Sequence, residues 1–235
     1  NLLKPGIDRV IIGLSPETSS RASSLVAWCS RQGWIDAVSV PASAPVGAQF
    51  RHLYAEAVRL ADPEQVVHLC FPDRLLFALT DTYRSQFIDD LFLAVADEPL
   101  LFVRSSLAWA THPQVYRDAE GMVTTLGRLL IGRELDFAWC HLALPARDLS
   151  DCLPTLRRQD MSVMAELVWH LKDRIRTKAV DWLAWEDPFV LRTDGDTLRS
   201  ERDASVDELD RRLNYVLPML DVLATNARAE REPES

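Results

Sequence analysis

Residues 8–14 read DRVIIGL, residues 35–40 read IDAVSV and residues 65–71 read QVVHLCF. The first is a continuous β-branched run, which is typical of a strand buried on both faces of a parallel sheet. Apolar residues at helical spacing separate the three runs, most clearly over residues 48–61. The alternation of strand and helix predicts right-handed βαβ units.

The pattern continues along the chain. We expect a helix over residues 75–95, a strand over 100–104, less regular chain over 105–133 and a strand over 135–144. Helices at 146–156 and 161–174, a strand at 179–185 and an amphipathic helix at 206–223, kinked at Pro218, then follow. The predicted fold is α/β, with a single mainly parallel central sheet flanked by helices. The domain covers residues 1–200, and residues 201–235 form a helical C-terminal extension.

Composition narrows the class of function. The chain has 235 residues, of which 48% are hydrophobic, and its net charge is −9. A negative surface argues against nucleic acid as a partner. No apolar stretch approaches the length of a transmembrane helix, so a cytoplasmic protein is expected. The four cysteines form no CxxC pair, which predicts free thiols rather than a zinc site or a redox dithiol.

Several common catalytic signatures are absent from the sequence. There is no P-loop, no GxGxxG after the first strand, no HExxH and no GxSxG. Function must therefore be sought in the loops after the strands, because ligands of parallel sheets bind beyond the carboxyl ends of the strands. These loops are residues 15–19, 41–47 and 72–74.

Carboxylates in and after these strands are candidates for a metal site. Asp73, followed by Arg74, comes directly after the third strand, where it could hold a cation that binds a diphosphate. Alternatively, Asp73 caps the helix that follows. Asp187, in the pair Glu186-Asp187, follows a later strand-like run, and a solvated turn is the alternative there.

Three further residues are candidates for catalysis or substrate binding. Asp160 and Glu166 flank the start of a helix, and a carboxylate beside an apolar face suits a general base. A helix cap or an ordinary helix residue is the alternative. His112 lies in chain that we expect to be irregular, where functional side chains often lie.

The order of these features resembles the GT-A glycosyltransferases, the nucleotide-diphospho-sugar transferases, and most closely family 2-like enzymes and glucosyl- or mannosyl-glycerate-type synthases. The resemblance covers about residues 8–190 and is one of order and spacing. It rests on Ser15-Pro16-Glu17 after the first strand, the helix start from Gly47 to Arg51, and Phe71-Pro72-Asp73 in place of the family's Asp-x-Asp. Phe71 replaces the first aspartate of that motif.

The resemblance implies that the protein binds a nucleotide sugar and transfers the sugar to a small hydroxyl acceptor. It assigns substrate binding to Ser15, Pro16, Glu17, Gly47, Arg51, Asp73, Arg74 and His112, catalysis to Asp160 and Glu166, and an Mg²⁺ or Mn²⁺ ion to Asp73 and Asp187. The alternatives are a non-catalytic relative that binds a nucleotide sugar or a partner protein, favoured by Phe71, and an unrelated nucleotide-binding module. The apolar stripe of the C-terminal helix could also form a homodimer contact.

Overall fold

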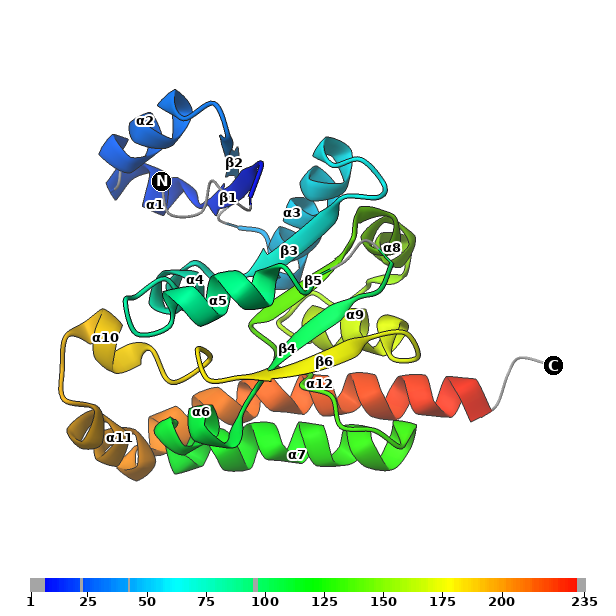
Figure 1. Ribbon diagram of the computed structural model, residues 1–235. Coiled ribbons are helices and arrows are strands. Elements are labelled where there is room, and N and C mark those ends of the chain that lie inside the picture. Colours follow the sequence, from blue (N-terminus) through cyan, green and yellow to red (C-terminus); the bar gives the residue numbers. More distant parts are fainter. Residues whose placement is uncertain (1–6, 22, 42, 95–96, 232–235) are drawn as a thin grey trace.

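The computed structural model describes residues 7–21, 23–41, 43–94 and 97–231, and it is a mixed α/β structure (Figure 1). Its strands are β1 (Val10–Leu14), β2 (Ile35–Ser39), β3 (Val66–Cys70), β4 (Leu100–Arg104), β5 (His141–Pro145) and β6 (Arg176–Val180). Its helices are α1 (Pro16–Arg21), α2 (Ser23–Arg31), α3 (Val46–Leu60), α4 (Pro72–Ala78), α5 (Arg84–Leu91), α6 (Ser106–Thr111), α7 (Gln114–Ile131), α8 (Ala146–Cys152), the 3-10 turn η1 (Leu153–Thr155), α9 (Val163–Leu171), α10 (Asp187–Leu191), α11 (Gly195–Ala204) and α12 (Val206–Arg231).

The strands form two sheets rather than one. β1 and β2 make a parallel pair, and the other strands make a four-stranded sheet in the order β3-β5-β4-β6. β5 is antiparallel to both β3 and β4, whereas β4 and β6 are parallel. Consequently β3, β4 and β6 run in one direction and β5 runs against them. The expected α/β class is confirmed, but the arrangement is not the single mainly parallel sheet that we expected.

β5 explains this difference. Its residues are buried throughout, and so are most residues of β4. A continuous apolar run of this kind indicates a central strand but does not reveal its direction. The chain approaches β5 from the carboxyl edge of the sheet, after α7, so that β5 enters between β3 and β4 in the opposite direction.

Two apolar layers cover the four-stranded sheet. On one face, residues of α3, α8, α9 and α12 pack against Leu101, Leu142 and Leu144. On the other face, Ala78 of α4 and Phe87 of α5 pack with Phe102 and Trp182. The alternation of Leu101 and Phe102 between the two layers follows from the two-residue period of a strand.

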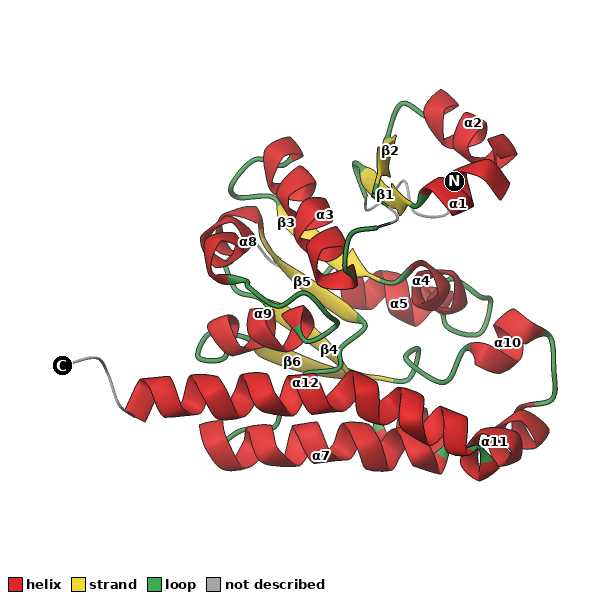
Figure 2. Cartoon of the chain, turned by 180° about the vertical axis from the view of Figure 1, so that it is seen from behind, coloured by secondary structure: helices red, strands yellow, loops and turns green. Residues whose placement is uncertain are grey.

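The C-terminal helix is part of the main core. α12 lies along α7, as both ribbon views show (Figure 2). It contributes Val216, Met219, Val222 and Leu223 to the core cluster that contains the sheet residues. The helix runs to Arg231 and includes Pro218. Of the apolar stripe expected from the sequence, Val216 is buried in this core, whereas Val206, Leu209 and Leu217 are exposed, so the packed face of α12 differs from that stripe.

Several segments differ from the sequence expectation. The strand expected over 135–144 begins only at His141, and the strand expected over 179–185 is β6, which ends at Val180. The helix expected over 75–95 is two helices, α4 and α5, separated at residues 79–83. The stretch 105–133, expected to be less regular, is mostly helical, as α6 and α7. Ser105 caps α6 by accepting a hydrogen bond from the Ala108 amide at 3.1 Å, and Gly132 ends α7 with a left-handed φ of 74°. His112 and Pro113 interrupt this segment only briefly, between α6 and α7.

Candidate functional site

The candidate site lies at the edge of the four-stranded sheet where β3, β4 and β6 end and β5 begins. Four segments meet this edge, namely the start of α4, the start of α6, residues 135–140 and residues 181–187. They come from widely separated parts of the chain. Because the strands stop here, the polar side chains that follow them are not needed for the sheet and are available to a ligand.

Arg74 and Glu186 form a buried ion pair at this edge. Their side chains are 11% and 5% exposed, and Arg74 also faces the carbonyl oxygen of Ala184 at 3.5 Å. Burial raises the pKa of Glu186 to about 7, against the opposing effect of Arg74, and the charges of Asp187 and Asp73 raise this pKa further. Glu186 is thus a carboxylate that exchanges a proton near neutral pH, as a general acid or base does.

Two predicted metal ligands, Asp73 and Asp187, both act electrostatically on Glu186 and raise its pKa. Asp73 is exposed in the first turn of α4 and accepts a hydrogen bond from the Arg74 amide at 2.9 Å. Asp187 begins α10 and lies 3.6 Å from the guanidinium of Arg202. The two carboxylates thus follow β3 and β6, and among the described residues neither belongs to a group of three potential ligands close enough to share a metal ion.

Arg104 is the centre of a second, deeper group of charges. Its guanidinium is 2.9 Å from Glu120 and 3.0 Å from Asp136, and it lies over the ring of Trp109 at 4.4 Å. Burial lowers the pKa of Arg104, but Glu120 and Asp136 outweigh this effect and raise it. Arg212 of α12 lies 3.2 Å from the other oxygen of Glu120. The network therefore ties the end of β4 to α7 and α12.

His112 joins the two groups. It is completely buried, and its Nδ1 lies 2.9 Å from the carbonyl oxygen of Ala108. Burial and the charges of Arg104, Arg74 and Arg212 lower its pKa well below the usual value, so the ring is neutral. With Nδ1 donating to Ala108, the buried Nε2 is an acceptor, and no residue that the structure describes donates to it.

Other predicted residues form a separate group around residues 157–160. Gly47 donates its amide to the Gln159 carbonyl at 2.9 Å, and Arg51 donates to the Arg158 carbonyl. Glu166 accepts the amides of Arg157 and Arg158, both at 2.9 Å. Asp160 accepts the amide of Ser162 at 2.8 Å and also the Ser162 hydroxyl. The side chains of Asp160 and Glu166 thus hold backbone, and this group braces a loop against the start of α3.

The remaining predicted residues lie at the start of α1. Ser15 follows β1, α1 begins at Pro16, and Glu17 forms an ion pair of 2.9 Å with Arg21 one turn later. Glu17 is exposed. This segment is a third location, distinct from the cluster of Asp73, Arg74, His112 and Asp187.

A cavity of about 340 Å³ adjoins the deeper charges and is lined by Trp109, Gly121, Thr124, Thr125, Arg128 and Glu134. Trp109 is its link to the site, because the same ring contacts Arg104 and lies 5.3 Å from the His112 ring. The cavity presents an aromatic ring, hydroxyls and charges, a mixture that is suited to a polar organic molecule.

Sequence reasoning missed the charged residues of the inner network. Arg104 ends an apolar strand, and Asp136 stands in the apolar run LDFAWC. A charged residue in such a run is rarely buried without a partner, and this signal could have identified both. Glu120 and Arg212 lie on amphipathic helices and carry no comparable signal. Their importance follows from contacts across the fold.

Comparison with known proteins assigns no relative. The chain has no significant match among protein-family models, curated proteins or solved structures. Across the described part of the chain, none of the helices combines the length and the apolar character needed to cross a membrane.

Proposed function

We propose that the protein is a glycosyltransferase-like enzyme that binds a nucleotide-diphospho-sugar at the carboxyl edge of the four-stranded sheet and transfers the sugar to a small hydroxyl acceptor. The observation that carries this proposal is Glu186, a carboxylate buried at this edge beside Arg74, whose pKa is raised by burial and by the charges of Asp187 and Asp73. The resemblance assigned Asp73 and Asp187 to the metal and diphosphate of the donor. Their shared effect on Glu186 supports that assignment.

Carboxylate oxygens are the donors that a divalent ion such as Mg²⁺ or Mn²⁺ prefers, but the oxygens of Asp73, Glu186 and Asp187 do not lie close enough together in this structure to share one ion. Asp73 and Asp187 are the residues that would hold the ion, and Phe71 leaves the Asp-x-Asp position with one carboxylate. Bound there, the ion would neutralise charge on the departing nucleoside diphosphate. Arg202 beside Asp187, and Arg74 beside Glu186, fix these carboxylates in position.

The residues of the chain have separate parts in this proposal. Arg74 supplies positive charge for the donor phosphates, because its guanidinium is at the same edge as Asp73. Glu186 takes the proton of the acceptor hydroxyl, since its pKa of about 7 allows the carboxylate to gain a proton at neutral pH. We assign this role to Glu186 in preference to Asp160 and Glu166, whose oxygens accept backbone amides.

The cavity beside Trp109 is the place we assign to the acceptor. Its volume of about 340 Å³ suits a molecule of monosaccharide size. The indole ring contacts Arg104 and the ring of His112, so an acceptor in the cavity lies beside the deeper group of charges around Arg104. Thr124 and Thr125 offer hydroxyl groups for hydrogen bonds to an acceptor of this kind.

Donor binding is the direct test. Thermal unfolding would be followed with UDP-, GDP- and ADP-sugars, each with Mg²⁺, Mn²⁺ or EDTA. A ligand at about 100 times its Kd adds roughly 2.7 kcal/mol to the free energy of unfolding. We expect one sugar nucleotide to stabilise the protein with metal and not with EDTA. Asp73→Asn and Asp187→Asn should each abolish the effect, and the exposed α5 carboxylate provides the control, Asp89→Asn.

Two outcomes would contradict the proposal. Stabilisation by none of the sugar nucleotides would exclude the donor class, and equal stabilisation of the wild type and both site variants would exclude the site. Binding without release of nucleoside diphosphate, over a panel of sugar and polyol acceptors, would instead identify a non-catalytic protein that binds nucleotide sugars. Phe71, which leaves a single carboxylate at the Asp-x-Asp position, favours that second function.

A further inference from the structure

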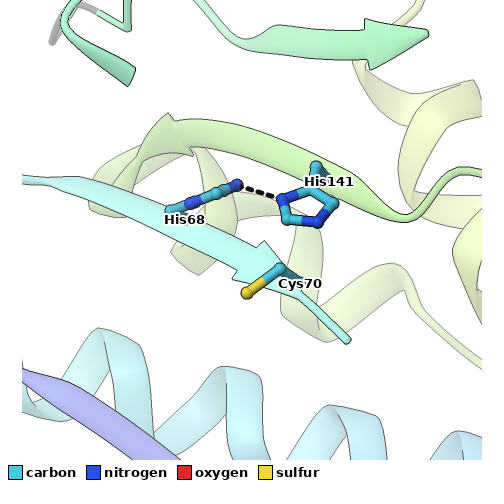
Figure 3. A group of neighbouring side chains, drawn as sticks. All are labelled: His68, Cys70 and His141. Atoms are coloured by element: carbon cyan, nitrogen blue, oxygen red, sulfur yellow. Dashed lines mark hydrogen bonds between the residues drawn. The ribbon is translucent and has the colours of Figure 1, made fainter. Parts of the chain in front are cut away.

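A separate cluster of potential metal ligands lies between β3 and β5. His68 and Cys70 are two residues apart on β3, so their side chains lie on the same face of the sheet. In the antiparallel register Cys70 lies opposite His141 of β5 (Figure 3). Phe87 and Trp182 contact this group from the layer that α4 and α5 form.

The spacing of the ligand atoms is close to that of a chelate. Nε2 of His68 is 3.0 Å from Nδ1 of His141, and one ligand atom from each of His68, Cys70 and His141 lies within 4.8 Å of the other two. In a tetrahedral zinc site, two nitrogen ligands are about 3.3 Å apart and a nitrogen and a sulfur are about 3.6 Å apart, given the usual bond lengths. For an ion to bind, the two histidine nitrogens would have to move apart by a few tenths of an ångström. The ligand atom of Cys70 would have to move closer to the histidine ligand atoms by about 1 Å at most.

We propose that His68, Cys70 and His141 form a binding site for a zinc-like transition-metal ion, with a fourth position for water. Imidazole and thiolate ligands select zinc, cobalt and related ions over magnesium. The site thus differs in its metal chemistry from the carboxylates of Asp73 and Asp187. It does not depend on the proposed sugar transfer.

The protonation of the two histidines suits metal binding. Burial lowers the pKa of His68 to about 4, and burial together with the charges of His68 and Arg74 lowers that of His141. Both rings are therefore neutral at physiological pH, which is the form that binds a metal.

Cys70 must lose its proton when the ion binds. Burial raises the pKa of its thiol to about 12, so the metal-free residue is a neutral thiol. Binding forms a metal–sulfur bond, breaks the S–H bond and releases one proton to solvent. The charge of Asp73 also raises the pKa of this thiol. The same negative charge would attract an incoming cation. It would offset the positive charge of Arg74, which lowers the pKa of His141.

The test is a titration of the full chain, freed of metal with EDTA, with Co²⁺. Cobalt reports tetrahedral coordination through intense visible bands and reports thiolate coordination through near-ultraviolet charge transfer. We expect one equivalent to bind with both signals and to be displaced by Zn²⁺. Cys70→Ser should lose the charge-transfer band, and His68→Gln should weaken binding at least tenfold. Cys152→Ser, which alters a buried thiol on α8, is the control and should bind as the wild type does.

The proposal is overturned if Co²⁺ does not bind stoichiometrically, or if Cys70→Ser keeps the charge-transfer band. In that case the histidines form only a hydrogen-bonded pair. Circular dichroism of each variant without metal checks folding. If Cys70→Ser does not fold, Cys70→Ala and His68→Asn decide the question by the same spectra, and the wild-type titration alone still refutes the site if no thiolate band develops.

Discussion

Arg104 at the end of β4 and Glu120 in the middle of α7 form an ion pair of 2.9 Å, and their side chains are only 3% and 4% exposed. The same guanidinium lies 3.0 Å from Asp136. Two carboxylates in the interior thus share this cation, and Glu120 also pairs with Arg212 at 3.2 Å. Such a pair is costly to break, because the remaining charges cannot regain water.

Arg104→Leu is expected to lower the free energy of unfolding by about 3–5 kcal/mol, since it leaves Glu120 and Asp136 buried without this partner. Urea unfolding measures the loss. The control is Arg84→Leu, which removes an exposed pair with Asp81 and is expected to cost about 0–1 kcal/mol. Losses of similar size in the two variants would show that the Arg104 network is not a stabilising element.

Glu208→Gln is expected to give a pH-dependent loss of stability. Burial raises the pKa of Glu208, but hydrogen bonds from Arg211 and other neighbours outweigh it and lower this pKa to about 2. The charged form is therefore favoured in the folded state. The stabilisation is present above the ordinary pKa of 4.5 and is lost as the pH falls toward 2.

At pH 7 we expect the wild type to exceed the Glu208→Gln variant by about 2 kcal/mol, as for hydrogen bonds to a charged group. Urea unfolding at several pH values between neutrality and the acid limit of folding tests this. A difference that stayed constant down to the lowest pH would contradict the assignment of the effect to ionised Glu208.

Gly127 and Gly121 give a matched pair on α7. A Cβ at Gly127 would lie 2.2 Å from the ring of buried Phe137, whereas one at Gly121 would meet no atom within 4 Å. Alanine raises helix propensity at both positions by roughly 0.5–1 kcal/mol. We expect Gly121→Ala to stabilise the protein and Gly127→Ala to destabilise it by about 1–3 kcal/mol through overpacking. Thermal unfolding compares them, and equal stabilisation of both would refute the close approach.

Trp182→Phe tests a buried hydrogen bond. The indole N–H of Trp182 donates to Asp90 at 2.8 Å, and the Asp90 residue is 6% exposed. Loss of this hydrogen bond is expected to lower the free energy of unfolding by about 1–3 kcal/mol, in addition to the effect of the smaller ring. Trp169→Phe is the control, because Trp169 is also buried and donates to Glu230, whose carboxylate is 52% exposed and can bind water instead. Equal losses in urea unfolding would show that burial of the acceptor is unimportant.

The proposed transfer reaction has an expected pH profile. Glu186 accepts a proton only when it is ionised, so the rate should rise with pH through a midpoint near 7, the pKa that burial gives this group. Glu186→Gln should abolish most of the transfer rate and the increase of this rate with pH, while the variant still binds the donor. Initial rates from pH 5.5 to pH 8.5, roughly the range that frames this midpoint, measure it. A wild-type profile flat through neutrality would exclude Glu186 as the base.

The sequence by itself determined the local elements whose signals are strong. The apolar runs at 8–14, 35–40 and 65–71 predicted β1, β2 and β3, and the run 100–104 predicted β4. Helical spacing predicted α3 almost to its ends. These signals are local because burial of a strand or of a helix face leaves its period in the adjacent residues. They also placed Asp73 and Asp187 after strands, and the structure shows that both follow strands, β3 and β6, that run in the same direction.

The tertiary structure alone decided how these elements pair. The direction of β5 depends on the path of the chain after α7, and no residue of the run HLALP records it. That direction places His141 opposite Cys70, and the packing of α7 and α12 brings Glu120 to Arg104 and Arg212. Such pairs join residues that are distant in the sequence. They form because the whole molecule has its lowest free energy when its elements pack in this arrangement. The physical reason is that the partner of a side chain depends on the elements that pack around it. The periodicity of the sequence reports only which face of a helix or strand is buried.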